Sequence, residues 1–213
     1  MSKFVITLII LLFAGVCVFF VAKDAKPEIQ QSYKIVAFGD SLTAGYGVDD
    51  VDNYPSVLQE RLRMVNPNIT VVNMGVSGET TAGGLKRVDS VVAEKPDAVL
   101  LGFGANDILR SLSPSDAKAN LEEMIEKFQQ NNIRVILMGM RTSLNSAAVY
   151  RKEFNDIYPQ LAEKYDAVLI PFFLEGVVLK EDLNIADRLH PNTAGYVKIV
   201  DENIMPVVKG LFR

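Results

Sequence analysis

Residues 34–47 read KIVAFGDSLTAGYG, a short apolar run that leads directly into a loop rich in glycine and polar residues. An apolar run of this length that ends at a glycine is typical of a buried β-strand. The pattern recurs along the chain, and the expected strands are Lys34–Phe38, Ile69–Met74, Ala98–Phe103, Ile133–Met138 and Val168–Pro171. Strands that are apolar along their whole length need cover on both faces. The sequence therefore predicts an α/β sandwich of three layers around a five-stranded parallel sheet.

Longer segments between these runs carry apolar residues at intervals of three or four, which indicates helices. One of them opens at Ser113-Pro114, where serine suits the N-cap and proline the first turn. The others are expected at Tyr54–Asn66, at Ala82–Glu94, at Ala147–Tyr165 with a kink at Pro159, and at Asn192–Leu211, which carries Pro206.

The amino-terminal segment Phe4–Ala22 holds 19 residues without a charge. As a helix at ~1.5 Å per residue it would span roughly 28 Å, close to the hydrocarbon thickness of a bilayer. A cleaved signal usually has an apolar core of about 7–15 residues and small side chains just before the cut, whereas a cut after Ala22 leaves Phe20 at the third position before it. We therefore expect residues 1–22 to be an uncleaved membrane anchor, with secretion after cleavage as the alternative.

Residues 23–32 are polar and contain Pro27, which is typical of a linker, and residues 33–213 are expected to form the folded domain. Lys3, without a nearby acidic residue, favours an amino terminus that stays in the cytoplasm. The domain would then be exported to the periplasmic or extracytoplasmic side of the membrane. A linker of about ten extended residues reaches about 33 Å, which keeps the domain near the membrane surface.

The overall charge and the rare residue types exclude several classes of function. A net charge of −4 at pH 7 argues against a nucleic-acid-binding protein, which needs a basic face. The single cysteine and the single histidine exclude cysteine-rich and histidine-pair zinc sites. Any chemistry that depends on histidine must therefore use His190.

Polar residues follow the expected strands at the edge of the sheet where α/β proteins bind ligands. The candidates, in chain order, are Ser41, Gly78, Asn106, Asp187 and His190. A serine hydroxyl becomes an effective nucleophile when an imidazole takes its proton, and a carboxylate must hold that imidazole. Asp187 lies three residues before His190, so one turn can bring the two together. The oxyanion formed by attack on a carbonyl is expected to be bound by Gly78, Asn106 and the N–H of Ser41 itself.

The run Gly39-Asp40-Ser41-Leu42 resembles the GDSL block of the SGNH hydrolase family, and Asp187-Arg-Leu-His190 is similar to its D-x-x-H block. The four residues that give the family its name stand in the family's order: Ser41, Gly78, Asn106 and His190. The resemblance extends from Tyr33 to about Leu211. It implies a flavodoxin-like sheet in the order 2-1-3-4-5, with no cofactor and no metal.

Within that family the chain is most similar to bacterial acyl thioesterases, lysophospholipases and arylesterases, through Asn73–Thr80 and Ile157–Leu161. One departure is Ala105, where close relatives often have glycine. Asp40 is interpreted as a residue that organises the turn, not as a fourth catalytic group.

The sequence thus predicts a serine ester hydrolase with Ser41 as nucleophile, His190 as general base and then acid, and Asp187 as its orienting carboxylate. Ser41, Gly78 and Asn106 are expected to form the oxyanion hole. The expected substrates are small acyl esters or thioesters of medium to long chain, with lysophospholipids as candidates, and the protein is expected to be a monomer. A carbohydrate O-acetylesterase and a catalytically silent binding module on the same fold remain alternatives, and no substrate-binding residue is assigned.

Overall fold

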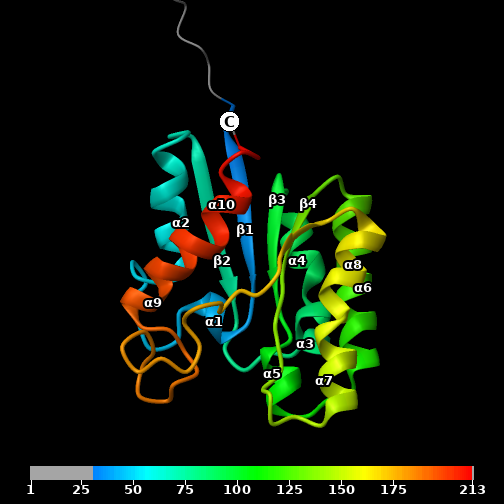
Figure 1. The fold of residues 1–213 in the computed structure, drawn as a ribbon. Coiled ribbons are helices and arrows are strands. Elements are labelled where there is room, and N and C mark those ends of the chain that lie inside the picture. The colour runs from blue at the N-terminus through cyan, green and yellow to red at the C-terminus, as the bar shows by residue number, and fades with distance from the viewer. Residues whose placement is uncertain (1–30, 213) are drawn as a thin grey trace, which may run out of the picture.

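The computed structural model describes residues 31–212, whose five strands form one parallel sheet in the order β2-β1-β3-β4-β5 (Figure 1). The strands are β1 (Tyr33–Gly39), β2 (Ile69–Gly75), β3 (Ala98–Gly102), β4 (Arg134–Met138) and β5 (Val168–Ile170). Each strand ends close to its predicted bounds, so the predicted α/β architecture and strand order are confirmed. The predicted anchor at residues 1–22 and most of the predicted linker lie outside the described residues.

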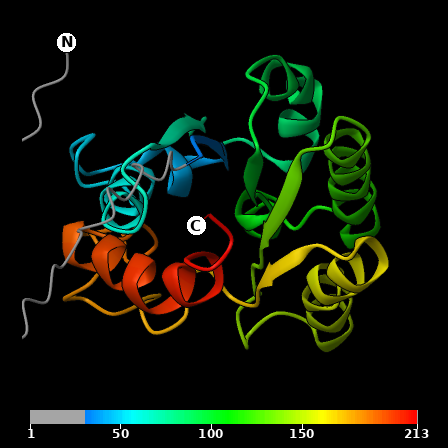
Figure 2. The ribbon, with the colours of Figure 1, turned by 90° about the horizontal axis from the view of Figure 1, so that it is seen from above.

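Helices cover both faces of this sheet, as Figure 2 shows from above. One face carries α2 (Tyr54–Arg63), α9 (Thr193–Lys198), a π-helical segment (Ile199–Ile204) and α10 (Met205–Val208). The other carries α3 (Thr81–Lys86), α4 (Val88–Ala93), α6 (Pro114–Gln130), α7 (Ala148–Asn155) and α8 (Ile157–Tyr165). Two short helices lie at the carboxyl edge of the sheet: α1 (Ser41–Ala44) and α5 (Ala105–Leu109). Within residues 31–212, no helix has the length and apolar character needed to cross a bilayer.

The core lies directly beneath the carboxyl end of β1. Phe38 is fully buried there and packs edge-to-face against Phe103 and Phe128, with ring centroids 4.9 and 6.1 Å apart. Aromatic pairs in this arrangement contribute about 0.5–1.5 kcal/mol beyond the burial of their surface. The loop that follows β1 is therefore supported by closely packed aromatic side chains.

One helix that the sequence predicts as continuous is divided by a tertiary contact. The predicted helix Ala82–Glu94 is wrong as a single element, because Arg87 leaves the helical conformation (φ −117°, ψ 12°) and separates α3 from α4. There its guanidinium donates to the carbonyl of Gly39, at 3.1 Å, and binds the carboxylate of Glu79. By contrast, α6 begins where predicted, because the Ser113 hydroxyl caps it.

Two further predicted helices are interrupted near proline residues. The predicted helix Ala147–Tyr165 breaks at Asp156, three residues before the predicted kink. Pro159 has no N–H, and its ring crowds the carbonyl four residues earlier, so the break falls one turn ahead of it. The predicted helix Asn192–Leu211 contains the π-helical segment directly before α10, whose first turn holds Pro206. The wider π turn is a known way to interrupt a regular helix.

Three glycines, Gly39, Gly75 and Gly102, end neighbouring strands at the same level of the sheet. A Cβ atom on Gly75 would lie 2.2 Å from the backbone nitrogen of Ala44, so the close packing of α1 on the strand ends requires glycine. The first turn of α1, which holds Ser41, is thereby fixed against the carboxyl edge of the sheet.

Candidate active site

Ser41 is the first residue of α1 and follows β1 after a single intervening residue, Asp40. Asp40 is the N-cap of α1, and its carboxylate accepts a hydrogen bond of 3.0 Å from the N–H of Leu42. Aspartate is among the most favourable N-cap residues, because its oxygen pairs with a helical N–H that has no partner within the helix. The interpretation of Asp40 as the residue that organises this turn agrees with that geometry.

A continuous chain of hydrogen bonds links Ser41, His190 and Asp187. The Ser41 hydroxyl lies 2.8 Å from Nε2 of His190, and Nδ1 of the same ring lies 2.6 Å from Oδ2 of Asp187. The second oxygen of Asp187 accepts the backbone N–H groups of Leu189 and His190, at 2.9 and 3.0 Å. The predicted nucleophile, base and orienting carboxylate are thus hydrogen-bonded in the order that nucleophilic catalysis by a serine requires.

The loop between β5 and α9 is held by backbone contacts that place this histidine. The carbonyl of His190 accepts the N–H of Ile185 at 2.9 Å, and Asn184 forms an isolated antiparallel bridge with Pro191. Two residues beyond the histidine, the side chain of Asn192 accepts the N–H of Gly195 and begins α9. The imidazole is therefore supported on both sides by ordered backbone.

Electrostatics favour an ionised Asp187 beside the ring of His190. Burial alone raises the pKa of Asp187, but hydrogen bonds from the backbone and ring of His190 and from the backbone of Leu189 outweigh it, and the net pKa lies below its usual value. The ring of Tyr46 lies against His190, with centroids 4.8 Å apart. This contact covers part of the imidazole and restricts its rotation.

The backbone N–H groups of Ser41 and Gly78 are among those near the Ser41 hydroxyl that have no acceptor within residues 31–212. Ser41 lacks one because the first N–H groups of a helix have no partner in the helix. Gly78 has a φ of +80°, which side chains rarely allow, and its carbonyl accepts a 2.6 Å hydrogen bond from Arg110. Two residues earlier, Val76 attaches the same loop to β1 by donating its N–H to the carbonyl of Gly39 at 3.0 Å.

Asn106 lies in the first turn of α5 and reaches back toward the start of α1. Its Nδ2 donates to Oδ2 of Asp40 at 3.2 Å, and Asp40 is the residue directly before Ser41. Ala105, the departure noted in the sequence, is half-buried against the core. The five predicted site residues therefore gather at one edge of the sheet, with Asp40 as an additional link between two of them.

Sequence reasoning missed three contacts in this region. Tyr46 against the imidazole, Arg110 on the Gly78 carbonyl, and the bond from Asn106 to Asp40 all join residues from different loops. A signal was present for the last one, because β1 and β3 are neighbours and both residues follow the ends of these strands. The first two depend on loop conformation, which has no periodic pattern.

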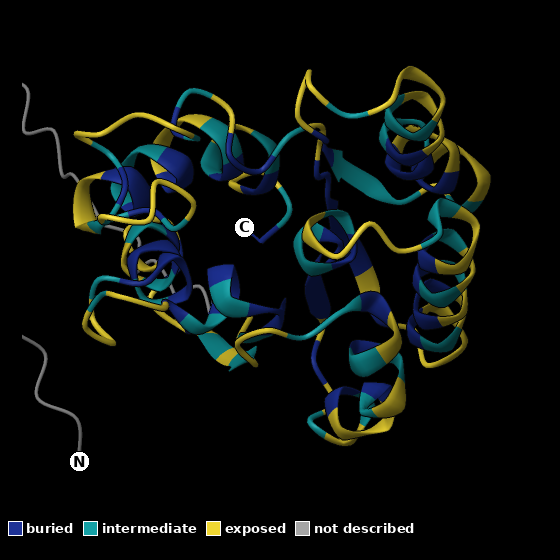
Figure 3. Ribbon diagram, turned by 90° about the horizontal axis from the view of Figure 1, so that it is seen from below, coloured by how far each residue is buried: buried dark blue, intermediate teal, exposed yellow. Residues whose placement is uncertain are grey.

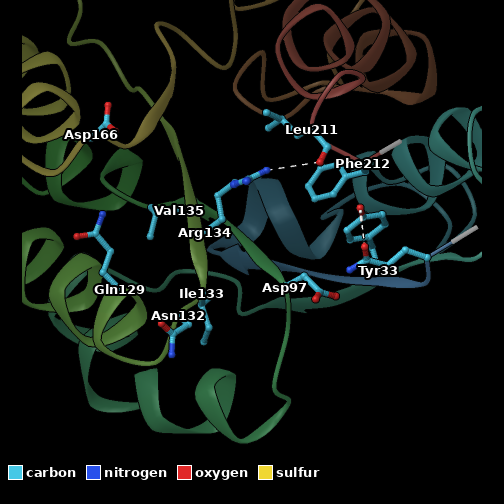
Figure 4. A pocket seen from close by; sticks show the side chains of 11 residues that line it. Tyr33, Asp97, Gln129, Asn132, Ile133, Arg134, Val135, Asp166, Leu211 and Phe212 are labelled. Atoms are coloured by element: carbon cyan, nitrogen blue, oxygen red, sulfur yellow. Dashed lines mark hydrogen bonds between the residues drawn. The ribbon is translucent and has the colours of Figure 1, made fainter.

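The carboxyl edge is seen from below in Figure 3, where exposed loops surround the ends of the strands. A hollow of about 550 Å³ lies at the opposite edge, lined by residues such as Asp97, Arg134 and Phe212 (Figure 4). None of the predicted site residues lines it. No group of three His, Cys, Asp or Glu residues suited to a metal is present in the described part of the chain, and the expected absence of a metal stays a prediction.

The GDSL-like lipase/acylhydrolase family matches residues 37–198 of the chain. An arylesterase of Vibrio mimicus is 37% identical over 183 residues, which cover 85% of this chain and 92% of that protein. The thioesterase 1/protease 1/lysophospholipase L1 of Escherichia coli (strain K12) is 32% identical over 178 residues, which cover 82% of this chain and 84% of that protein. The crystal structure of AlinE4, an SGNH-hydrolase family esterase, is 45% identical with a TM-score of 0.72 and covers 86% of this chain and 99% of that one.

Proposed function

Because the chain belongs to the GDSL-like lipase/acylhydrolase family and is a serine hydrolase of carboxylic esters or thioesters, we propose that Ser41, His190 and Asp187 are its catalytic triad. The observation that carries this proposal is the hydrogen-bonded chain from the Ser41 hydroxyl through both ring nitrogens to the Asp187 carboxylate. His190 is the only histidine of the sequence, so no second imidazole competes for the role of base.

The reaction proceeds through an acyl-enzyme. As Oγ of Ser41 bonds to the acyl carbon, its proton moves to Nε2 of His190 and the carbonyl electron pair moves to the oxygen. Collapse of this intermediate breaks the bond to the alcohol or thiol, which leaves with the proton from His190. Water then attacks the acyl carbon in the same way, and the proton that His190 takes from it returns to Ser41 as the acid departs.

Asp187 and the oxyanion hole stabilise the charges that develop in these steps. Asp187, held ionised by its hydrogen bonds, stabilises the imidazolium and fixes the tautomer whose Nε2 accepts a proton. The oxyanion is bound by the N–H groups of Ser41 and Gly78 and by the side-chain amide of Asn106. Removing one such donor in a serine protease lowers kcat by about 10²–10³-fold.

The substrates we propose are acyl esters and thioesters of medium to long chain, with lysophospholipids among them. Large apolar side chains are exposed on segments that follow the strands, including Tyr46 at 54%, Leu109 at the end of α5 at 62% and Leu144 at 85% exposure. Of these, Tyr46 lies against His190, and an exposed apolar side chain beside a site favours an apolar ligand. The names of the relatives, arylesterase and thioesterase/lysophospholipase, agree with such substrates.

Hydrolysis of a p-nitrophenyl ester by the Ser41→Ala variant tests the triad. The variant is expected to lose at least about 10³-fold in kcat, because the nucleophile is absent. A Ser41→Ala protein with the activity of the wild type would refute the assignment. A wild-type protein without hydrolytic activity would instead favour a silent binding module.

A series of p-nitrophenyl esters from acetyl to palmitoyl tests the substrate class. We expect kcat/KM to rise beyond the acetyl ester, because each buried CH₂ contributes about 0.8 kcal/mol of binding. A sharp optimum at acetyl, together with release of acetate from acetylated sugars, would favour the carbohydrate O-acetylesterase.

We also propose that the domain is exported and tethered by residues 4–22. The charge-free length of this segment is the support. The described part of the chain enters the sheet at the amino end of β1, at the edge opposite to Ser41. Full-length protein should sediment with membranes and become soluble when residues 1–22 are deleted, whereas soluble full-length protein in the cytoplasm would contradict the proposal.

A further inference from the structure

Two aspartates are buried among the described residues, Asp40 at 0% and Asp107 at 2% exposure. Burying a carboxylate is unfavourable unless hydrogen bonds compensate for the lost water. The two differ in what surrounds them. Asp107 is bound by the N–H and hydroxyl of Thr81, at 2.9 and 2.6 Å, within the layer of α3. Asp40 divides its two oxygens between two parts of the active site.

We propose that Asp40 is a positioning residue for the oxyanion hole, whose carboxylate keeps the side-chain amide of Asn106 turned with its nitrogen toward the reacting oxygen. This inference rests on the proposed role of Asn106 as an oxyanion donor. Asp40 itself contacts neither the substrate nor the reacting atoms, so it acts only through Asn106 and through α1.

The orientation of Asn106 follows from what a carboxylate can accept. An amide has a donor end and an acceptor end of nearly equal shape, whereas an ionised carboxylate only accepts. With Oδ2 of Asp40 beside it, only the donor end of Asn106 can face the carboxylate. Nδ2 has two hydrogens, so one binds Asp40 and the second remains for the oxyanion. The reverse orientation would bring two acceptor oxygens together and point the amide oxygen at a developing negative charge.

The same carboxylate connects the amide to the nucleophile. Its Oδ1 accepts the N–H of Leu42, the residue after Ser41, at 3.0 Å. The start of α1 and the first turn of α5 come from different strand ends, and Asp40 is bonded to both. One buried group therefore sets the relative position of the attacking hydroxyl and of the amide that receives the oxyanion.

The surroundings of Asp40 make this contact dependent on pH. Burial raises the pKa of Asp40 to about 6, although the hydrogen bonds from Leu42 and Asn106 and the charge of His190 lower it. Asp107 raises it further. The charge of Asp40 in turn contributes to the raised pKa values of three tyrosines: Tyr54, Tyr158 and Tyr196. A protonated Asp40 can donate a hydrogen bond, so below its pKa it no longer selects the donor end of Asn106.

A double-mutant cycle between Asp40→Asn and Asn106→Ala tests the inference, with an aryl ester as substrate. Asparagine keeps the size and the N-cap acceptor at position 40 but removes the acceptor-only character. We expect Asp40→Asn to lower kcat about 10–100-fold with little change in KM, and Asn106→Ala to lower it about 10²–10³-fold. Once Asn106 is absent, Asp40→Asn should lower kcat by no more than about threefold, because there is no amide left to orient.

Two more variants control for folding. Asp40→Ser keeps a cap for Leu42 but is too short to bind Asn106, so it should show the same loss of kcat as Asp40→Asn. Asp107→Asn removes the other buried carboxylate and should keep kcat within about threefold. The loss caused by Asp40→Asn should also shrink from about pH 8 to about pH 5, because the wild-type Asp40 takes up a proton there.

The outcomes distinguish this inference from the proposed function. If the double variant shows the product of the two single losses of kcat, Asp40 does not act through Asn106 and the inference is wrong. The proposed oxyanion hole is unaffected by that result. If Asn106→Ala keeps wild-type kcat, the oxyanion role of Asn106 fails first. A Ser41→Ala protein that stays active would remove the basis of both.

Discussion

The two edges of the sheet differ in chemistry more than in shape. The amino edge has a hollow of about 550 Å³, and its polar groups are used for structure: Asp97 accepts the N–H of Lys34 at 2.7 Å. The carboxyl edge holds Ser41 against His190, with N–H groups of Ser41 and Gly78 that have no acceptor among residues 31–212. The proposed reactivity follows the unpaired donors and Ser41, not the hollow.

The direction of the strands explains the difference. In a parallel sheet the carboxyl ends of all strands meet at one edge, and the following helices begin there. Helix starts supply unpaired N–H groups and a partial positive charge. In this chain α1 begins two residues after the end of β1, and α5 three residues after the end of β3. The amino edge receives helix ends and strand starts instead, which offer no comparable set of donors.

The largest loss of activity is expected for a substitution at the carboxyl edge, His190→Ala. We expect kcat to fall by about 10⁴-fold or more, because the sequence has no second histidine to take the serine proton. Steady-state hydrolysis of an aryl ester measures this loss, with the circular dichroism spectrum as a check on folding. Added imidazole should restore a part of the activity in the variant and none in Ser41→Ala. A His190→Ala enzyme within tenfold of the wild type would place the base elsewhere.

A second test concerns stability, since the carboxyl edge holds a buried charge that the amino edge lacks. The pKa of Asp40 is raised from an ordinary 3.8 to about 6, so the native state binds its proton more tightly than the unfolded state. The wild type therefore loses stability as pH rises from about 4 to about 6, and this loss persists above that range. Asp40→Asn should be more stable by about 1–3 kcal/mol near pH 8, with the gain disappearing toward pH 4.

Urea unfolding at several pH values measures this gain, and Asp97→Asn is the matched control at the other edge. Asp97 is exposed and binds a backbone N–H, so its replacement should bring no gain at any pH. A gain for Asp40→Asn that did not depend on pH would contradict the raised pKa. A variant that is more stable yet slower would be a trade-off of the kind often found at active sites.

The smallest effect is expected at the amino edge itself. Arg134 lines the hollow, and its guanidinium donates one long hydrogen bond of 3.5 Å to the carbonyl of Leu211. Arg134→Ala should change kcat/KM by less than about twofold and stability by no more than about 0.5 kcal/mol, as for other surface substitutions. Steady-state kinetics and thermal unfolding measure both. A tenfold loss of kcat/KM would show that the hollow takes part in function, and would contradict the view that only the carboxyl edge is functional.

Much of the fold could be predicted because the strands carry their own signal. The run KIVAF is apolar at four successive positions and buried on both faces, and the other strands repeat this pattern. Helix interruptions were less predictable. Arg87 separates α3 from α4 while its side chain binds Gly39 and Glu79, and contacts so distant along the chain leave no trace in local periodicity.

The residues of the site also differ in how far the sequence predicts their contacts. Ser41, Asp187 and His190 belong to short blocks with a chemical logic, so their meeting could be anticipated before any distance was measured. The contacts of Tyr46 with His190 and of Arg110 with the Gly78 carbonyl could not, because they depend on how loops fold toward each other. Residue type identifies the reacting groups, whereas tertiary structure decides which neighbour holds each of them in place.

Labelling with a fluorophosphonate, followed by peptide mass spectrometry, tests the central claim most directly. Such a probe forms a stable bond with an activated serine and mimics the tetrahedral intermediate. We predict one adduct per chain, on the peptide that contains Ser41. The Ser41→Ala variant should form no adduct on that peptide, and the His190→Ala variant should form it much more slowly than the wild type. The account would be contradicted if the active wild-type enzyme formed no adduct with the probe, or formed it on another serine.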